Sequence, residues 1–133
     1  PSWSTSKNVE EALVNLTDLS PSQRKNRIAE LMEQTGLSKS LLDTPVRKLS
    51  GGEQRRLALL RSLSISPEFL ILDEVTAGLD LISTEAVLQL LEKYEQEHDC
   101  AYLVITHDLQ VASRLCEAIY EIEHGKFTKK AVR

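Results

Sequence analysis

The stretch Leu49-Ser50-Gly51-Gly52-Glu53 stands directly before a run of apolar residues at helical spacing, and the rest of the chain is best interpreted outward from it. Ser50 is a suitable N-cap, and Glu53, three residues later, completes a capping box. Two glycines in the first turn leave the backbone N–H groups accessible, although each costs about 1 kcal/mol of helix propensity. Such a start belongs either to an ordinary capped helix with a glycine turn or to an anion site.

The helix that begins at Gly51 is predicted to run to about Ile65, before Ser66-Pro67. Its core face carries leucines at helical spacing: Leu57, Leu60 and Leu63. Its opposite face, which we interpret mainly as a solvated surface, carries three arginines: Arg55, Arg56 and Arg61.

Upstream of this helix, the sequence predicts a module of small helices. Asn8 is the expected cap of the first helix, after a polar loop. Ser20-Pro21-Ser22-Gln23 is a second capping box, and Gly36 is expected to end the helix that follows it. A short helix over residues 38–42 completes the module.

Downstream, the apolar run Phe69–Leu72 ends abruptly in Asp73-Glu74. A run without alternation is typical of a parallel strand that is covered on both faces. Two carboxylates at its carboxyl end stand where open α/β sheets bind their ligands. The alternative is that Asp73 only caps the following turn. Two adjacent acidic side chains repel each other, however, so a functional reason for their presence is favoured.

The remaining segments alternate between helices and strands. A helix over Leu81–Glu97 precedes a second buried strand, Ala101–Ile105, which ends in Thr106-His107-Asp108. Asp108 is the expected cap of another helix, and a third strand, Ala118–Ile122, leads into a hairpin turn at residues 123–126. In the long helix we expect five side chains to point inward: Ala86, Val87, Leu90, Leu91 and Tyr94. The pattern predicts an α/β region with a parallel sheet.

Composition narrows the class of protein. The 133 residues are 41% hydrophobic and 27% charged, which is typical of a folded domain. The longest apolar runs are far shorter than the roughly 20 residues that span a bilayer. Two cysteines give neither a metal cluster nor a disulfide framework. The net charge of −4, with basic residues in excess only in the first half, does not favour a nucleic-acid partner.

Four motifs now stand in one order, and together they resemble the second half of an ATP-binding-cassette (ABC) ATPase domain. The resemblance covers essentially residues 45–127. Its parts are the signature motif at Leu49–Glu53, the Walker B strand at Phe69–Asp73 followed by the catalytic-glutamate position Glu74, the D-loop at Ala77–Asp80, and the switch histidine His107. Two departures are Glu53, where glutamine is more usual, and Val75, where proline is usual.

The resemblance implies a fold and a division of the chain. The expected fold is a partial P-loop NTPase (RecA-like) α/β core with a mostly parallel sheet, joined to an all-α helical subdomain. Residues 1–66 would be the helical subdomain, and residues 67–133 the C-terminal part of the core. No G-x-x-x-x-G-K-[ST] phosphate loop can be built from the five glycines. We therefore expect the chain to be a fragment that lacks the N-terminal phosphate-loop half.

The resemblance also implies roles for individual residues. Leu49–Glu53 would contact ATP held by another domain, chiefly through Ser50, Gly51 and Gly52 on the γ-phosphate. Asp73 would orient Mg²⁺, mainly through its water, and Glu74 would act on the attacking water. His107 would contact the γ-phosphate. Asp80 would contact the partner domain.

The implied function is that of an ABC transporter ATPase subunit that powers solute import, of the oligopeptide or nickel/metal-chelate type. Its partners would be a second ATPase domain, arranged head to tail, and transmembrane permease subunits, with the protein on the cytoplasmic face of the cell membrane. Alone, the chain is expected to be inactive and to self-associate through an exposed hydrophobic sheet edge. The alternatives are a soluble DNA-maintenance ABC ATPase and a non-catalytic interaction module. The presence of both Glu74 and His107 argues against the latter.

Overall fold

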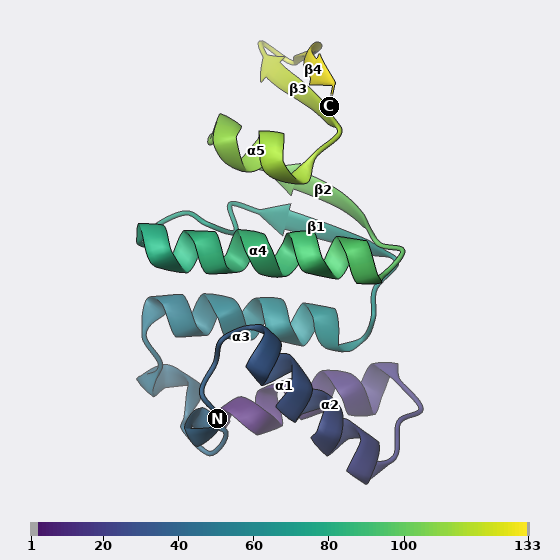
Figure 1. Ribbon diagram of the computed structural model, residues 1–133, viewed down its shortest axis with the longest axis vertical. Coiled ribbons are helices and arrows are strands. Elements are labelled where there is room, and N and C mark those ends of the chain that lie inside the picture. The colour runs from purple at the N-terminus through teal and green to yellow at the C-terminus, as the bar shows by residue number, and fades with distance from the viewer. Residues whose placement is uncertain (1–2, 133) are drawn as a thin grey trace.

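The computed structural model describes residues 3–132 and arranges them as a helical end, a small central sheet and a terminal hairpin (Figure 1). The helices are α1 (Thr5–Leu16), α2 (Pro21–Gln34), the 3₁₀ turns η1 (Lys39–Leu41) and η2 (Val46–Lys48), α3 (Gly51–Ser64), α4 (Leu81–Glu97) and α5 (Leu109–Leu115). The strands are β1 (Phe69–Asp73), β2 (Ala101–Ile105), β3 (Ala118–Glu123) and β4 (Lys126–Val132).

The predicted start of the first helix is wrong, because Ser4 and not Asn8 is the cap of α1. The Ser4 hydroxyl accepts a hydrogen bond from the Lys7 amide at 3.3 Å. Ser4 also forms a β-bridge with Pro45, and the Thr5 amide donates to the Thr44 carbonyl at 2.9 Å. Because of these contacts with Thr44 and Pro45, the helix starts about one turn before the predicted position.

The second helix begins and ends as predicted. Ser20 and Gln23 form the reciprocal capping box, and Pro21 occupies the first helical position. Gly36 adopts a φ of 66°. This left-handed conformation is common just after the end of a helix, and glycine adopts it readily. The short helix predicted for residues 38–42 is one 3₁₀ turn, η1.

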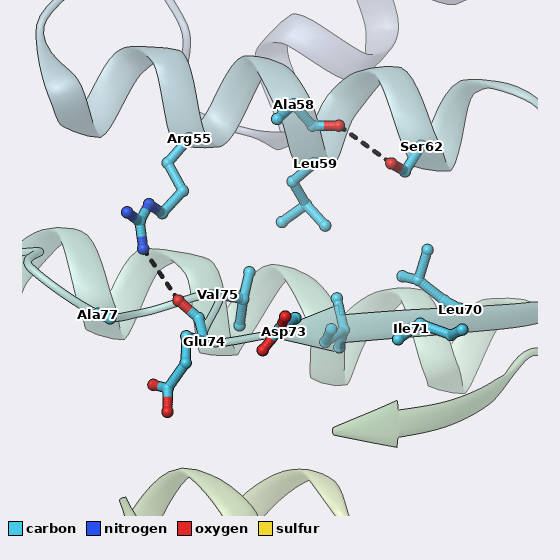
Figure 2. A pocket seen from close by; sticks show the side chains of 11 residues that line it. Arg55, Ala58, Leu59, Ser62, Leu70, Ile71, Asp73, Glu74, Val75 and Ala77 are labelled. Atoms are coloured by element: carbon cyan, nitrogen blue, oxygen red, sulfur yellow. Dashed lines mark hydrogen bonds between the residues drawn. The ribbon is translucent and has the colours of Figure 1, made fainter. Parts of the chain in front are cut away.

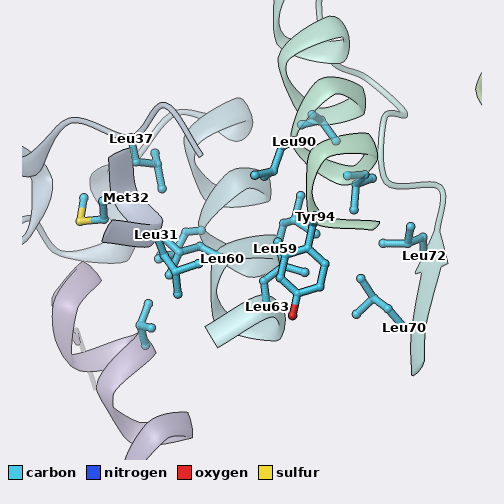
Figure 3. Packing of buried hydrophobic residues seen from close by; sticks show 14 of the residues in the cluster. Leu31, Met32, Leu37, Leu59, Leu60, Leu63, Leu70, Leu72, Leu90 and Tyr94 are labelled. Carbon is cyan, nitrogen blue, oxygen red and sulfur yellow. The ribbon is translucent and has the colours of Figure 1, made fainter. Parts of the chain in front are cut away.

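Helix α3 lies at the centre of the hydrophobic core (Figure 3). Leu57, Leu60 and Leu63 are buried as predicted, and Leu59 is buried as well. On one side of α3 the core is built by residues of the helical end, such as Leu31, Met32 and Leu37. On the other side it is built by the sheet and by α4: Leu70, Leu72, Leu90 and Tyr94. One hydrophobic cluster therefore joins the helical end to the sheet.

Strands β1 and β2 pair in parallel, as predicted, with Phe69 opposite Ala101 and Asp73 opposite Ile105. The prediction that both faces are covered is wrong for the described chain. Leu70 and Leu72 are buried on one face, whereas the other face exposes four large apolar side chains. These are Phe69, Ile71, Leu103 and Ile105. No described residue supplies a second layer over them, so β2 is not a buried strand.

The third predicted strand is present as β3, but it pairs with β4 and not with the central sheet. The antiparallel β3–β4 hairpin lies beyond α5, away from β1 (Figure 1). Its two-residue turn places His124 and Gly125 at φ 49° and 74°, which is the primed turn geometry that tight hairpins require. Pairing across so short a loop is entropically favourable, and no described strand lies beside β3 on its other edge.

Helix α4 has the predicted bounds, and four of its five predicted core residues are buried. The exception is Ala86, which is exposed, whereas Leu88 is buried in its place. On the helical repeat Ala86 and Leu88 flank the face made by Val87, Leu90, Leu91 and Tyr94 on its two sides, and only the Leu88 side is covered. Within residues 3–132, none of the helices combines the length and the apolar character needed to cross a membrane.

Substituting Leu60 tests the central position of α3. Leu60 is fully buried, so Leu60→Ala should lower the free energy of unfolding by about 2–5 kcal/mol through lost apolar burial and the cavity left behind. Urea denaturation followed by circular dichroism measures the change. Leu16→Ala, at a position that is 65% exposed, is the control and should cost less than about 0.5 kcal/mol.

Candidate functional site

The start of α3 is a complete capping box, as predicted. The Glu53 amide donates to the Ser50 hydroxyl at 3.3 Å, and the Ser50 amide donates to Glu53 Oε2 at 2.7 Å. The hydrogen bond from the Ser50 amide is the main reason why the pKa of the Glu53 carboxyl is lowered. Glu53 is therefore held as a carboxylate beside the first turn.

The two glycines of this turn are not required by packing within the described chain. A Cβ atom at Gly51 would meet no atom within 4 Å. A Cβ atom at Gly52 would lie at ordinary contact distance, 3.7 Å from Ser83 Oγ and 3.8 Å from Leu79 Cδ2. The described chain would therefore tolerate alanine at both positions, and the close approach of a ligand to these glycines stays a prediction.

Asp73 and Glu74 lie at the carboxyl end of β1, where they were predicted. Asp73 is exposed, and the Glu74 amide donates to the Ile105 carbonyl of β2 at 2.9 Å. Glu74 adopts a φ of 48°, a conformation that costs a non-glycine residue roughly 1 kcal/mol. Such a backbone persists only where the surrounding contacts hold it, as the bond to Ile105 does here.

Arg55 contacts this loop, which corrects part of the solvated-face interpretation of α3. Its Nη1 atom donates to the Glu74 carbonyl oxygen at 2.9 Å (Figure 2). The other two arginines are also not simply solvated. Arg61 forms an ion pair with Glu11 of α1. Arg56 buries its Nε atom, and its guanidinium lies near Gly36.

Glu74 and His107 follow two different strands, as predicted. Their side chains are in direct contact. Glu74 Oε1 lies 2.9 Å from His107 Nδ1 and accepts a second hydrogen bond from the His107 amide at 3.2 Å. The carboxylate favours the imidazolium form and raises the pKa of His107, first through the hydrogen bond and then through its charge. With Nδ1 engaged, Nε2 is left for another partner, on a side chain that is 81% exposed.

Asp80 is the N-cap of α4. It accepts hydrogen bonds from the Ser83 amide at 2.9 Å and from the Ser83 hydroxyl at 2.8 Å, and the first of these lowers the pKa of its carboxyl. Because Ser83 also lies beside Gly52, the D-loop adjoins the start of α3. The contact between Asp80 and a partner domain stays a prediction.

An open pocket of about 330 Å³ lies between α3 and β1 (Figure 2). Its polar end is formed by Arg55, Asp73 and Glu74, and the rest of its lining is mostly apolar. Ser50, Gly51 and Gly52 are not among the lining residues. The signature glycines therefore do not line this pocket, although Arg55, one helical turn after Gly51, does.

Among residues 3–132, no three histidine, cysteine or carboxylate side chains gather into a metal site. Asp73 offers one exposed carboxylate. Mg²⁺ in nucleotide sites usually binds one or two such carboxylates together with oxygens of the phosphates. Its role toward Mg²⁺ stays a prediction.

An ion-pair cluster that sequence reasoning missed joins α5 to α4. Arg114 donates to Glu85 at 2.6 Å and to Glu92 at 2.8 Å. Glu85 and Glu92 are seven residues apart, which places them on one face of α4. This spacing is the sequence feature from which the cluster could have been predicted. Because α5 begins directly after Asp108, this cluster helps to fix the segment that carries His107.

Comparisons with known proteins point to one family. A family model described as "ABC transporter" matches residues 2–77. The nickel import ATP-binding protein NikE of Escherichia coli K12 is 35% identical over 122 residues, which are 92% of this chain and 46% of that protein. The chain thus spans about half the length of the curated relatives that it matches.

Two solved structures share the fold. The dimeric post-hydrolysis state of an ATP-binding cassette bound to ADP and Pi has a TM-score of 0.87 at 30% identity, covering 100% of this chain and 58% of that one. CbiO1 of Clostridium perfringens, part of an ABC transporter complex, has a TM-score of 0.81 at 29% identity, covering 96% and 50%. These likenesses confirm the predicted fold class.

The pairing of Glu74 with His107 can be tested by titration. In Glu74→Gln the pKa of His107, measured by NMR, should fall toward its ordinary value of 6.5, because the neutral amide no longer favours the imidazolium. The raised pKa also means that the pair stabilises the fold fully below pH 6.5 and that this contribution is lost as pH rises through the raised value. An unchanged pKa of His107 would show that the two side chains do not interact in solution.

Proposed function

The chain belongs to the ABC transporter family, and we propose that it supplies an ATP-hydrolysing cassette with its signature helix, its catalytic carboxylate and its switch histidine. The observation that carries the proposal is the contact between Glu74 and His107 at 2.9 Å, at the carboxyl ends of two paired parallel strands. This is where open α/β sheets bind ligands. A carboxylate and an imidazole so placed suit proton transfer and contact with a phosphate.

In this proposal Glu74 acts on the attacking water as general base or by polarising it, provided that the water stands in line with the γ-phosphate. His107 contacts the same phosphate through Nε2, since its Nδ1 atom faces Glu74. The raised pKa of His107 favours the charged imidazole, which suits an anionic ligand.

Asp73 is the residue that we assign to Mg²⁺, mainly through a metal-bound water. Its carboxylate is exposed at the end of β1, beside Glu74, and is chemically suited to the ion. When bound together with ATP, Mg²⁺ would neutralise charge on the phosphates. ATP itself is the substrate, and one related structure holds its products, ADP and Pi.

We propose that the signature residues, Leu49–Glu53, act on nucleotide held by a second ATPase domain. Within this chain, Ser50, Gly51 and Gly52 are not among the residues that line the pocket at Glu74. A related cassette is dimeric. In a head-to-tail dimer, residues 1–66 would act as the helical subdomain that presents α3, residues 67–133 as part of the core, and Asp80 as a contact to the partner.

The proposed process is solute import, of the nickel, metal-chelate or oligopeptide type. Its support is the similarity to a nickel import ATP-binding protein and to a subunit of an ABC transporter complex. Transmembrane permease subunits would be the partners, which would place the protein on the inner face of the membrane. These relatives favour a transporter over a DNA-maintenance ATPase, and no observation favours a nucleic-acid partner.

The 133-residue chain should bind ATP·Mg²⁺ only weakly and should not hydrolyse it. Its sequence offers the signature, Walker B and switch residues but no phosphate loop, which in P-loop ATPases cradles the phosphates. Isothermal titration of the purified chain with ATP and Mg²⁺ measures the affinity. Micromolar binding would contradict the assignment of Ser50–Glu53 as half of a shared site.

In an intact cassette that contains this chain, Glu74→Gln should leave ATP binding unchanged and slow hydrolysis by roughly 100-fold or more, because the amide cannot accept a proton from water. Steady-state release of phosphate and a nucleotide-binding assay separate the two effects. Glu68→Gln, at an exposed carboxylate just before β1, is the matched control and should keep its activity. Normal turnover of the Glu74 variant would refute the catalytic assignment.

A further inference from the structure

Arg114 is the only charged side chain of α5, and two carboxylates of α4 bind it. Its Nε and Nη2 atoms donate to Glu92 at 2.9 and 2.8 Å, and its Nη1 and Nη2 atoms donate to Glu85 at 2.6 and 3.3 Å. The hydrogen bond from Arg114 is the main reason why the pKa of the Glu85 carboxyl is lowered. Paired charged hydrogen bonds are directional, because the planar guanidinium must face each carboxylate. The cluster therefore fixes the side on which α5 faces α4.

The apolar contacts of α5 restrain its rotation less well than its distance from the core. Three side chains of this seven-residue helix are buried: Val111, Ala112 and Leu115. Val111 and Leu115 are one turn apart and form a single ridge, with Ala112 on one flank and Arg114 on the other. Burial of apolar surface is not directional, so it opposes separation of α5 from the core more than rotation about this ridge. The hydrogen bonds of Arg114 oppose that rotation.

The start of α5 is joined directly to His107. Asp108 caps the helix by accepting hydrogen bonds from the Gln110 amide at 2.8 Å and from the Val111 amide at 3.4 Å, and His107 is its neighbour in the chain. Cα atoms lie about 2.3 Å from the axis of a helix, so a rotation of about 20° would move the start of α5 by about 0.8 Å. The hydrogen bond from the His107 amide to Glu74 is already 3.2 Å long, at the upper end of the usual range. A displacement of that size would break it.

We propose that Arg114 is a positioning residue, which sets the place of His107 relative to Glu74 through the orientation of α5. The inference rests on the proposed function, in which Glu74 acts on the attacking water and His107 contacts the γ-phosphate. Arg114 acts on the reaction only through the helix that it holds. An arginine is suited to this task, because its rigid fork binds two carboxylates at once.

Titration of His107 in the 133-residue chain, followed by NMR, is the first test. Glu74 and Asp108 are the charged groups that raise the pKa of His107, and the hydrogen bond to Glu74 is the main cause. Loss of the positive charge of Arg114 alone would raise this pKa further. If Arg114 positions His107, the pKa of His107 in Arg114→Met falls instead toward 6.5, because the hydrogen bond to Glu74 is weakened.

Two further variants separate geometry from charge. Lys93→Met removes a cation of α4 that pairs with Glu97, and it should not lower the pKa of His107. Arg114→Lys keeps the positive charge but cannot bind both carboxylates through one planar fork, so it should lower this pKa by less than Arg114→Met does. If Arg114→Met does not fold, Arg114→Lys carries the test alone, since no charge is lost in it.

Activity is measured in an intact cassette that contains this chain. Arg114→Met should lower kcat about 3- to 30-fold, because small displacements of a reacting group are costly. ADP lacks the γ-phosphate that His107 is proposed to contact, so the Kd for ADP should change less than about twofold. A residue that only stabilised the fold would lower the amount of folded protein without this selective loss. Lys93→Met should keep the wild-type kcat.

The outcomes distinguish this inference from the function on which it rests. An unchanged or raised pKa of His107 in Arg114→Met, or a normal kcat, would overturn the positioning role, while an inactive Glu74→Gln would leave the proposed function standing. Full activity of Glu74→Gln would remove the proposed function itself. A lowered pKa of His107 in Arg114→Met would even then show that Arg114 places His107 beside Glu74.

Discussion

The structure depends on burying both sides of α3. Leu60 and Leu63 are completely buried, and the cluster around them extends from Met32 in the helical end to Leu72 in the sheet. A helix held on two sides cannot slide without opening two interfaces. Its first turn and its arginines are thereby fixed relative to β1, which is why one helix both presents a glycine turn to the outside and contacts Glu74 on the inside.

The parts of the fold that were predictable are those that short-range chemistry specifies. Ser50 and Glu53 define the start of α3 through a capping box that needs no other residue. The unbroken apolar run before Asp73 indicated a strand in a parallel pair. The positions of Glu74 and His107 at the carboxyl ends of two strands were predicted, whereas the direct contact between their side chains was seen only in the structure.

The parts that could not be predicted depend on segments that are far apart in the sequence. The early start of α1 requires Thr44 and Pro45, about 40 residues away. The apolar run of β1 cannot show how many layers cover it, and one face with Ile71 is exposed. Arg55 and Arg61 lie about 120° apart around α3, but the sequence does not show that the loop after β1 lies on the Arg55 side and α1 on the Arg61 side.

Glu53 gives the start of α3 one more property. Its carboxylate already occupies the Ser50 amide and lies against the positive end of the helix dipole, and its lowered pKa keeps it charged throughout the neutral range. This carboxylate partly cancels the positive potential at the start of the helix. An anion that approaches the helix start is therefore repelled by a fixed negative charge. An amide at this position would exert no such repulsion. If an anion binds at this helix start as proposed, the carboxylate makes that binding weaker than an amide at the same position would.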